Sequence, residues 1–376
     1  MSNLLEYCPT SPDFALRWEA MEQDYEWLRN LRGCPQDPIF HAEGDVAIHT
    51  RMVCAELVAL PAWRALPADE RQLLFAAAVL HDVGKPDCTK LEEHGRITSR
   101  GHSRRGAILA RQILWRMRVP FAVREQIASL IRYHQAPYYL IERDDPVRLA
   151  IEISQTTRGD LLALLAEADV RGRISQTKQH MLDNVALFAE QMAELGCVRS
   201  PFRFPSEAAR VLYFRDRGRH PESPVPPKFR SDVVIMSGLP GAGKDSHVRK
   251  HFSAIEQISL DHFRAELDVS PDDAQGAVLQ AAWGRARELL RKEHPFVWNA
   301  TNLSRQIRGQ SIQLCLDYGA RVSIVYVEVA PQILAEQNRR RGGTAQVPTK
   351  AIERMFDRWE VPDLTEAHAV ELAIEE

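Results

Sequence analysis

The chain has 376 residues, 45% of them hydrophobic and 26% charged, which is the balance of a folded protein long enough for two domains. Its formal net charge of −3 excludes an overall basic excess for nucleic-acid binding, although it leaves room for a local basic groove. No run approaches ~18 consecutive apolar residues, the N-terminus has no basic start before an apolar core, and the six cysteines show no paired spacing. We therefore expect a cytoplasmic protein with reduced thiols and no membrane span.

The first half of the chain has a helical pattern. Residues 46–60, 70–82, 104–118 and 121–134 repeat apolar side chains at steps of three and four, the period of an amphipathic helix. Between Asp45 and about Leu195 no short alternating strand pattern occurs. We expect an all-helical domain here. The first 40 residues stay unassigned, except that residues 25–33 are expected to pack on this domain as a helix.

A proline-rich segment follows the helical half. Residues 215–230 carry four prolines among charged residues, and proline fixes φ and removes a backbone donor. This composition predicts a stiff linker over 215–230, with one domain over 1–214 and a second over 231–376.

The second half alternates two kinds of segment. Short runs rich in β-branched residues lie at 233–236, 255–259, 296–299 and 322–327, with one more candidate at 367–374. Helical stretches such as 275–292 and 304–319 separate them. Strands alternating with helices favour a parallel sheet covered on both faces. The predicted fold class is therefore an all-α domain followed by an α/β domain with a parallel sheet.

Histidine and aspartate residues recur in or beside the helices of the first half. Imidazole and carboxylate groups are ligands of divalent transition metals such as Mn, Fe, Co, Ni or Zn. A bound ion would lower the pKa of its water toward neutrality and polarise a phosphoryl oxygen. A single buried histidine is more often an ordinary core residue, so the prediction depends on the whole set. The candidate ligands are His49, His81, Asp82, His102, His134 and Asp169.

Two of these candidates are adjacent, in the sequence HDVGK. His81 and Asp82 can serve two neighbouring metal ions, with the carboxylate as the bridge. Gly84 is expected to let the backbone turn after the pair, and Lys85 to neutralise a substrate phosphate.

The full ordered set, with Asp169 after the histidines, resembles the HD phosphohydrolase superfamily over about residues 40–195. The six-ligand form is similar to the two-metal branch of that superfamily. His41 and His94 have no place in the pattern, so we expect both on the surface.

The strand expected at 233–236 leads into a glycine-rich loop, GLPGAGK, which places a GxxxxGK pattern between a strand and a helix. In such a loop the backbone N–H groups cradle the phosphates of a nucleotide, the lysine reaches the β- and γ-oxygens, and the helix N-terminus favours the anion. Asp245 stands where Ser or Thr is usual, so the hydroxyl that contacts Mg²⁺ is expected from Ser246. Mg²⁺ and ATP or another NTP are expected to bind at Gly238, Gly241, Ala242, Gly243, Lys244, Asp245 and Ser246.

An acidic and a basic residue follow the second strand of this half. Asp261, at the strand end, can accept the proton of an attacking hydroxyl group. Arg264 lies one helical turn later and can hold a phosphate already present on the acceptor. The alternative is a helix-capping aspartate with a solvated arginine.

Two further arginines complete the expected nucleotide contacts. Arg308 lies on the helix after the third strand, which ends in Asn299 and is followed by Thr301 and Asn302. Arg341 ends a run of three arginines beside two glycines. Such a run predicts a mobile lid that closes over the transferring phosphoryl group, and a solvated basic helix end is the alternative.

These motifs together resemble the polynucleotide 5′-kinase branch of P-loop phosphotransferases. The resemblance implies that Asp261 is the general base, that Arg264 grips the phosphate of the acceptor, and that Arg341 is the lid arginine. Asn299 departs from the pattern, because many relatives carry an aspartate of the metal shell there.

A helical HD module followed by this kinase resembles the bacterial bifunctional HD phosphohydrolase–polynucleotide kinase family over about residues 40–365. The resemblance implies RNA end healing, in which one domain hydrolyses 2′,3′-cyclic phosphate and 2′-phosphate ends and the other phosphorylates a 5′-OH. RNA or DNA ends are the implied substrates, and a separate ligase is expected to act downstream. The implied catalytic residues are Lys85, Lys244, Asp261, Arg264 and Arg341.

Two other functions stay open at this point, because a fold does not decide a substrate. The chain could join a nucleotidase to a kinase of nucleosides or another small metabolite. It could also be a regulatory nucleotide-binding module whose metal site is inert.

Overall fold

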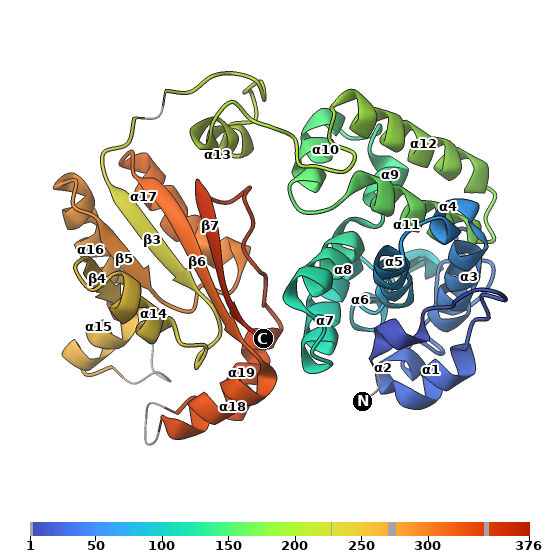
Figure 1. The fold of residues 1–376 in the computed structure, drawn as a ribbon, viewed down its shortest axis with the longest axis horizontal. Coiled ribbons are helices and arrows are strands. Elements are labelled where there is room, and N and C mark those ends of the chain that lie inside the picture. Colours follow the sequence, from blue (N-terminus) through green and yellow to red (C-terminus); the bar gives the residue numbers. More distant parts are fainter. Residues whose placement is uncertain (1–2, 227, 270–275, 342–345) are drawn as a thin grey trace. The chain divides into compact units, whose positions relative to one another are not determined.

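The computed structural model describes residues 3–226, 228–269, 276–341 and 346–376. Its internal contacts divide the chain into two compact units, Met1–Phe202 and Arg203–Glu376. Figure 1 shows that the first is built from helices and the second around a sheet. Within the described ranges, no helix has both the length and the apolar character needed to cross a membrane.

The first unit contains many short and medium helices joined by brief connections. Its elements are the 3-10 helices η1 (Leu4–Tyr7) and η2 (Glu93–Gly95), the strands β1 (Lys90–Leu91) and β2 (Ile97–Thr98), and the helices α1 (Trp18–Asp24), α2 (Glu26–Arg29), α3 (Val46–Ala59), α4 (Pro61–Arg64), α5 (Ala68–Leu80), α6 (Lys85–Cys88), α7 (His102–Arg116), α8 (Phe121–Tyr133), α9 (Ala136–Tyr139), α10 (Pro146–Ser154), α11 (Gly159–Arg171) and α12 (Lys178–Glu194).

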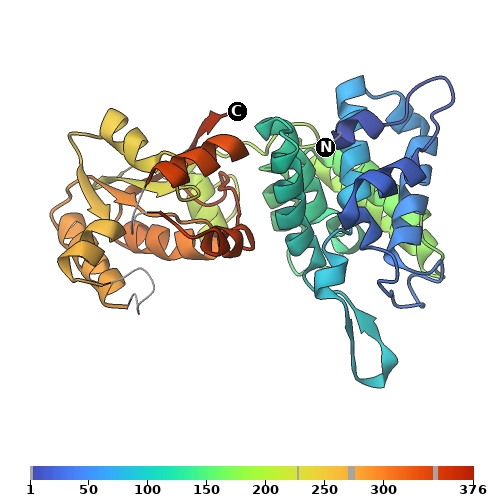
Figure 2. The same cartoon turned by 90° about the horizontal axis from the view of Figure 1, so that it is seen from below.

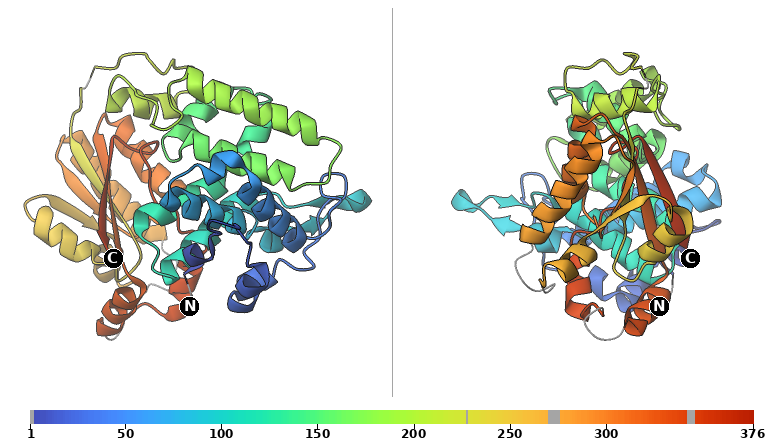
Figure 3. Two further views of the ribbon diagram at one scale, coloured as in Figure 1. Left: turned by 45° about the vertical axis from the view of Figure 1, so that its right-hand side comes forward. Right: turned by 90° about the vertical axis from the view of Figure 1, so that its left-hand side faces the viewer.

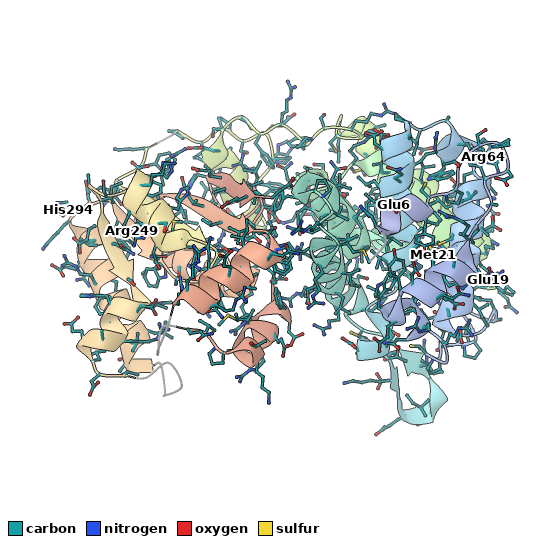
Figure 4. The ribbon with its side chains drawn as sticks, turned by 60° about the horizontal axis from the view of Figure 1, so that its bottom comes forward. Glu6, Glu19, Met21, Arg64, Arg249 and His294 are labelled. Carbon is teal, nitrogen blue, oxygen red and sulfur yellow. The ribbon has the colours of Figure 1, made fainter. Side chains whose placement is uncertain are left out.

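The core of this unit surrounds α5. Every residue from Leu73 to Leu80 is buried, so this part of the helix is apolar on all sides and is enclosed by its neighbours. It contacts η1, α3, α8 and α11, while α11 and α12 lie side by side (Figure 3). The N-terminal helices join the same core, because Met21 of α1 (labelled in Figure 4) and Leu28 of α2 are fully buried. The helix expected at 25–33 is therefore present in part, as α2.

A small hairpin interrupts the helices, contrary to the expectation that this half has no strands. Strands β1 and β2 pair antiparallel, with Lys90 opposite Thr98. Figure 2 shows the hairpin projecting from the helices of its own unit. Each strand has only two residues, which is too short to produce an alternating pattern that sequence reasoning could detect.

The second unit is a parallel sheet with helices between its strands. Its elements are α13 (Glu207–Arg215), β3 (Asp232–Ser237), α14 (Lys244–His251), β4 (Glu256–Ser259), α15 (Leu260–Glu266), α16 (Gly276–Arg291), β5 (Phe296–Asn299), α17 (Arg305–Asp317), β6 (Arg321–Val329), α18 (Pro331–Arg340), α19 (Thr349–Phe356) and β7 (Ala369–Glu375). The strand order is β4-β5-β3-β6-β7, and all neighbours run parallel. This confirms the predicted fold class.

Alternate residues of the strands build the core on one face of this sheet. Val233 and Ile235 of β3 point to the same side as Val322 and Ile324 of β6, where α16 and α17 cover them. This period of two is what a strand imposes on its side chains. Because all strands are parallel, their carboxyl ends lie along one edge, where ligands of such sheets bind.

The division between the units falls earlier than the proline-rich segment suggested. Helix α13 precedes residues 215–230 but belongs to the second unit. Arg210 donates to the carbonyl oxygens of Leu364 and His368, at 2.9 and 2.6 Å, and Arg321 pairs with Glu207 at 2.7 Å. The prolines therefore connect α13 to β3 inside one unit.

Candidate functional site

Four imidazole rings of the first unit lie in or directly after separate helices, and each has an oxygen atom close to its Nδ1. The Nδ1 atoms of His81, His102 and His134 each lie 2.7 Å from the backbone carbonyl oxygen three residues earlier. In the fourth, His49 on α3, Nδ1 lies 2.9 Å from Oε1 of Glu43. A ring that gives its Nδ1–H to an oxygen keeps the Nε2 lone pair for a metal.

All four Nε2 atoms point toward Asp82. Its Oδ2 lies 3.2 Å from Nε2 of His81 and 3.8 Å from that of His49. Its Oδ1 lies 3.3 Å from Nε2 of His102 and 3.8 Å from that of His134. One carboxylate therefore divides the imidazoles into two pairs, as a bridging ligand between two ions would.

The six expected metal ligands lie in two adjoining groups. His49, His81 and Asp169 form one group, and Asp82, His102 and His134 form the other, with the ligand atoms of each group within 4.8 Å of one another. Every one of the six residues is at most 5% exposed. Nε2 of His81 and both carboxylate oxygens of Asp82 are buried without a hydrogen bond to the described protein. Since buried polar atoms need a partner, this donor set fits divalent metal ions.

Metal binding requires neutral imidazole and ionised carboxylate, and His134 and Asp82 are in these states. At His81, by contrast, burial is outweighed by the Asp82 carboxylate, which raises the pKa of His81, so a metal ion would displace a proton from that ring. Burial, together with the nearby His102 and His81 rings, lowers the pKa of His134 to about 3, so this imidazole is neutral. Burial alone would raise the pKa of Asp82, but His81 and Lys85 hold it well below its usual value.

Asp169 on α11 is fixed by two residues that sequence reasoning missed. Arg173 donates to both carboxylate oxygens at 2.9 Å, and the hydroxyl of Tyr138 donates to Oδ2. Although burial would raise the pKa of Asp169, the Arg173 charge and the hydrogen bond with His49 hold it well below its usual value. Arg173 lies four residues after Asp169, which is the one signal in the sequence that could have identified it.

Glu43 and His41 form a further layer behind His49. Nδ1 of His41 lies 2.8 Å from Oε1 of Glu43, the oxygen that also faces His49. The His41 side chain is only 10% exposed, and burial lowers its pKa to about 3. The expectation that His41 is a surface histidine is therefore wrong, whereas His94 is exposed. No periodic pattern marks Glu43, because it lies in the loop before α3.

Lys85 lies inside the cluster. Its Nζ is 2.7 Å from Oδ2 of Asp82 and donates to Oε1 of Gln36 at 2.6 Å, and the residue is only 5% exposed. An ammonium group has three N–H donors, and the contact with Asp82 is an ion pair without hydrogen-bond geometry, so Lys85 keeps a donor for a substrate oxygen beside the one it gives to Gln36. In this structure Lys85 is already paired with the Asp82 carboxylate, before any substrate phosphate is present.

The backbone turns after the His81–Asp82 pair, as expected, but glycine is needed at position 84 for close packing and not for its conformation. The φ of Gly84 is −84° and its ψ is −10°, a conformation open to any residue. A Cβ at this position would lie 2.4 Å from the carbonyl oxygen of His102 and 2.5 Å from the amide nitrogen of Gly106. The missing side chain lets α7 approach the His81–Asp82 turn and brings His102 within reach of Asp82.

The second unit carries the glycine-rich loop between β3 and α14. Gly238, Gly241 and Gly243 all have positive φ, which glycine adopts without strain. A Cβ on Gly238 would lie 2.2 Å from the carbonyl oxygen of Val327 in the neighbouring strand β6. Ala242, between the last two glycines, is buried in the loop.

Lys244 closes this loop. Its Nζ donates to the carbonyl oxygens of Gly238 and Leu239, both at 2.9 Å. Burial lowers the pKa of Lys244 to about 8, with the neighbouring carboxylates of Asp245 and Asp261 opposing the shift. An arriving phosphate would meet this buried ammonium at the mouth of the loop.

The two residues after Lys244 occupy different surroundings. Oδ1 of Asp245 accepts a hydrogen bond of 2.7 Å from Nδ2 of Asn299, and Oδ2 lies 3.7 Å from the guanidinium of Arg341. Ser246 is exposed, and its hydroxyl accepts a hydrogen bond from Arg249, which Figure 4 labels on α14. The expected contact of Ser246 with Mg²⁺ therefore finds no support here, because this hydroxyl is turned to a solvent-facing arginine.

Asp261 and Arg264 lie at the carboxyl edge of the sheet, directly after β4. The two side chains form an ion pair within α15, and the Asp261 side chain is 83% exposed. Asp261 is still near enough to Lys244 to influence its pKa. The expected acceptor-side pair therefore lies beside the loop and is open to solvent.

Arg308 stabilises the fold and does not make the expected contact with a nucleotide. It is fully buried, pairs with both carboxylate oxygens of Glu366 at 2.7 and 2.8 Å, and donates to the carbonyl oxygen of Asn302 at 3.0 Å. Asn302 in turn donates to the Met236 carbonyl, and the Thr301 carbonyl accepts from the amide of Gly238 at 2.9 Å. This network holds the strand end from which the loop starts.

The expected lid follows α18. Asn338 donates to the carbonyl oxygen of Val347 and accepts from its amide, at 2.8 and 3.0 Å, so it joins the two ends of the intervening segment. Arg341 is the residue of this run that faces the loop, through Asp245. The adjoining glycines, 342 and 343, lie outside the described residues.

Comparisons with known proteins agree with this division of the chain. Residues 45–156 match the HD domain and residues 233–362 match the AAA domain. Multifunctional CCA proteins are similar over 39% of the chain, with 31% identity in Thioalkalivibrio sulfidiphilus and 32% in Stenotrophomonas maltophilia. The matched part is about a third of the length of these curated relatives, 34% and 35%.

A solved structure of a candidate kinase from Chloroflexus aurantiacus is also similar to the chain. It is 12% identical with a TM-score of 0.33, and the match covers 39% of this chain and 86% of that one. An HD domain implies a divalent metal, and the buried His/Asp groups can hold one. The chain thus consists of a helical HD domain followed by a P-loop, kinase-like AAA domain on a five-stranded parallel sheet.

Proposed function

We propose that this chain heals broken RNA ends. Its HD domain would hydrolyse 2′,3′-cyclic phosphate and 2′-phosphate ends, and its kinase-like domain would transfer the γ-phosphate of an NTP to a 5′-OH end. The observation that supports the proposal is the pairing, in one chain, of a buried two-group His/Asp centre with a phosphate loop whose Lys244 is close enough to Asp261 for that carboxylate to influence its pKa. The first is suited to phosphoester hydrolysis and the second to phosphoryl transfer.

In the HD domain the protein supplies a rigid, dry set of ligands. His49, His81 and Asp169 would hold one ion, His102 and His134 the other, with Asp82 between them. Divalent ions such as Mn, Ni, Co, Fe or Zn, when bound there, supply a nucleophilic water and polarise the phosphoryl oxygen. Gln36 orients Lys85, whose remaining N–H would hold a phosphate oxygen of the RNA end.

In the kinase-like domain the residues divide into donor-side and acceptor-side groups. The N–H groups of the glycine loop and the Lys244 ammonium would hold the phosphates of ATP or another NTP together with Mg²⁺. Asp261 would accept the proton of the 5′-OH, and Arg264 would hold the phosphate on the 3′ side of that nucleotide. Arg341 would contact the transferring phosphoryl group from the other side.

The open position of Asp261 favours a polymer end over a small metabolite. Sites for small molecules usually bury most of the ligand, yet this side chain is 83% exposed. A polynucleotide needs to present only its terminal nucleotide to such an open site, and RNA or DNA could do so. The products, a 5′-phosphate and a 3′-OH, are the ends that a separate ligase joins.

The test is to offer the protein RNA with a 5′-OH at one end and a 2′,3′-cyclic phosphate at the other, with NTP, Mg²⁺ and Mn²⁺ or Ni²⁺. We expect 5′ phosphorylation and loss of the cyclic phosphate, followed on a sequencing gel and by phosphate release. Oligonucleotides should be phosphorylated faster than mononucleosides. The proposal fails if neither end changes, and faster phosphorylation of free nucleosides would favour a metabolite kinase.

A further inference from the structure

The glycine loop of this chain has an exchanged pair of polar residues. In the usual motif a Ser or Thr follows the loop lysine, and an aspartate at a neighbouring strand end completes the Mg²⁺ site. Here the residue after Lys244 is Asp245, and the end of β5 carries Asn299. The carboxylate is therefore on the loop and the neutral side chain on the strand.

The contacts of Asp245 show that the two positions lie face to face. Nδ2 of Asn299 donates to Oδ1 of Asp245 at 2.7 Å, and Asn299 is 6% exposed, so its amide is held inside the protein. Strand β5 pairs directly with β3, the strand that leads into the loop, with Trp298 opposite Ile235. The amide thus fixes the carboxylate at the strand edge where the nucleotide phosphates are expected.

Charge at this point favours a cation beside the phosphates. Asp245 has only one positive neighbour at ion-pair distance among the described residues, Arg341, and that contact is 3.7 Å long. A carboxylate beside the phosphates of a nucleotide would repel them unless a cation lies between, and Mg²⁺ prefers carboxylate and phosphate oxygens as ligands. The hydroxyl of Ser246 offers no equivalent, since it faces Arg249.

We propose that Asp245, held by Asn299, supplies the protein carboxylate for the Mg²⁺ that accompanies the nucleotide, and that Ser246 does not. The proposal rests on the proposed kinase function of this domain. Asn299 acts as a positioning residue, which keeps one carboxylate oxygen engaged and leaves the other for the ion or its water.

The experiment measures binding and needs no turnover. A fluorescent, non-hydrolysable ATP analogue is titrated onto the full chain, first in EDTA and then with increasing Mg²⁺. Asp245→Asn is compared with Asn299→Ala, Ser246→Ala and a matched control, Asp232→Asn, which changes an exposed carboxylate at the start of β3. Lys244→Ala reports any analogue bound outside the loop.

The expected result is an opposite change in the two conditions. Asp245→Asn should raise the Mg²⁺ concentration for half-saturation by about tenfold or more, as loss of metal-site partners does, yet bind the analogue as well or better in EDTA. Asn299→Ala should raise the Mg²⁺ concentration for half-saturation by a smaller factor. Ser246→Ala and Asp232→Asn should leave this concentration unchanged. If Asp245 has only a structural role, Asp245→Asn will weaken binding of the analogue both in EDTA and with Mg²⁺. That result would overturn the proposal.

Two other results would also overturn it: an unchanged Mg²⁺ requirement in Asp245→Asn, or a raised one in Ser246→Ala. The outcome is separable from the proposed function. If the expected pattern appears but no RNA end is phosphorylated, the Mg²⁺ assignment stands and the RNA substrate is wrong. If RNA is phosphorylated and Asp245→Asn keeps its Mg²⁺ requirement, only the assignment of Asp245 is wrong.

Discussion

At the scale of single residues, the metal centre depends on groups that never touch a metal. Glu43 faces Nδ1 of His49 at 2.9 Å and is itself held by the amide of Ile174 at 2.8 Å. This carboxylate favours a proton on Nδ1 of His49, through a close contact that lacks hydrogen-bond geometry, and so favours a free Nε2 for a metal.

Glu43→Gln should weaken metal binding by about 10–100-fold, because a partner behind the ligand is lost, while the unit stays folded. The measurement is a competition between the protein and a chelator for Mn²⁺, with a circular dichroism spectrum to check the fold. Glu167→Gln is the matched control, since the ion-pair partner of Glu167 among the described residues is Arg171, one turn later on α11. Equal metal affinity in Glu43→Gln and wild type would contradict this role.

Lys244 gives the loop a defined pH dependence. Burial lowers its pKa to about 8, so the free protein loses this positive charge as the pH rises through 8. An anionic nucleotide binds the charged form, and its apparent affinity should fall by up to about tenfold per pH unit above that value.

Affinity for the ATP analogue between pH 7 and pH 9.5 measures this dependence. Lys244→Arg should show a flat profile over the same range, because a guanidinium stays charged. A fall of equal slope in wild type and Lys244→Arg would assign the titration to another group.

At the scale of elements, the start of the glycine loop leaves no room for a side chain. Gly238 has φ of 145°, and a Cβ there would lie 2.2 Å from the Val327 carbonyl of β6. Gly238→Ala should lower the free energy of unfolding by about 2–4 kcal/mol, through strain and overpacking, and abolish binding of the ATP analogue.

Gly284→Ala is the control within the same unit. Gly284 lies inside α16 with nothing within 4 Å of the added Cβ, so alanine should stabilise the helix by about 0.5–1 kcal/mol. Scanning calorimetry compares the two variants. A stable Gly238→Ala protein that still binds nucleotide would show that the loop can rebuild around a side chain.

Elements with a long, regular pattern could be predicted from the sequence. The apolar steps of three and four anticipated α3, α5, α7 and α8, and the β-branched runs anticipated the five strands of the sheet, because buried faces leave their period in the chain. Elements without a buried face left no such record. The hairpin β1–β2 was missed for this reason. The division at Phe202 was missed for another, because the buried face of α13 does not reveal in the sequence which unit it packs on, and only its contacts do.

At the scale of the whole molecule, the sequence predicted which side chains would gather but not what holds them. The six candidate ligands carry a recognisable order along the chain, and the structure brings them together. Glu43, Tyr138 and Arg173 escaped notice, because a supporting role depends on a neighbour that only the fold supplies. For Arg308 the sequence suggested a nucleotide contact that the structure does not show. An arginine on the helix after a strand can be fully engaged in a buried ion pair, here with Glu366.

We propose that this chain holds two centres that work independently on the two ends of one substrate. The direct measurement gives wild type, Asp82→Ala and Lys244→Ala the same RNA, with a 5′-OH and a 2′,3′-cyclic phosphate, and follows both ends. We predict that Asp82→Ala loses only the processing of the cyclic phosphate and that Lys244→Ala loses only 5′ phosphorylation. If each substitution abolished both reactions, or if wild type changed neither end, the account would be contradicted.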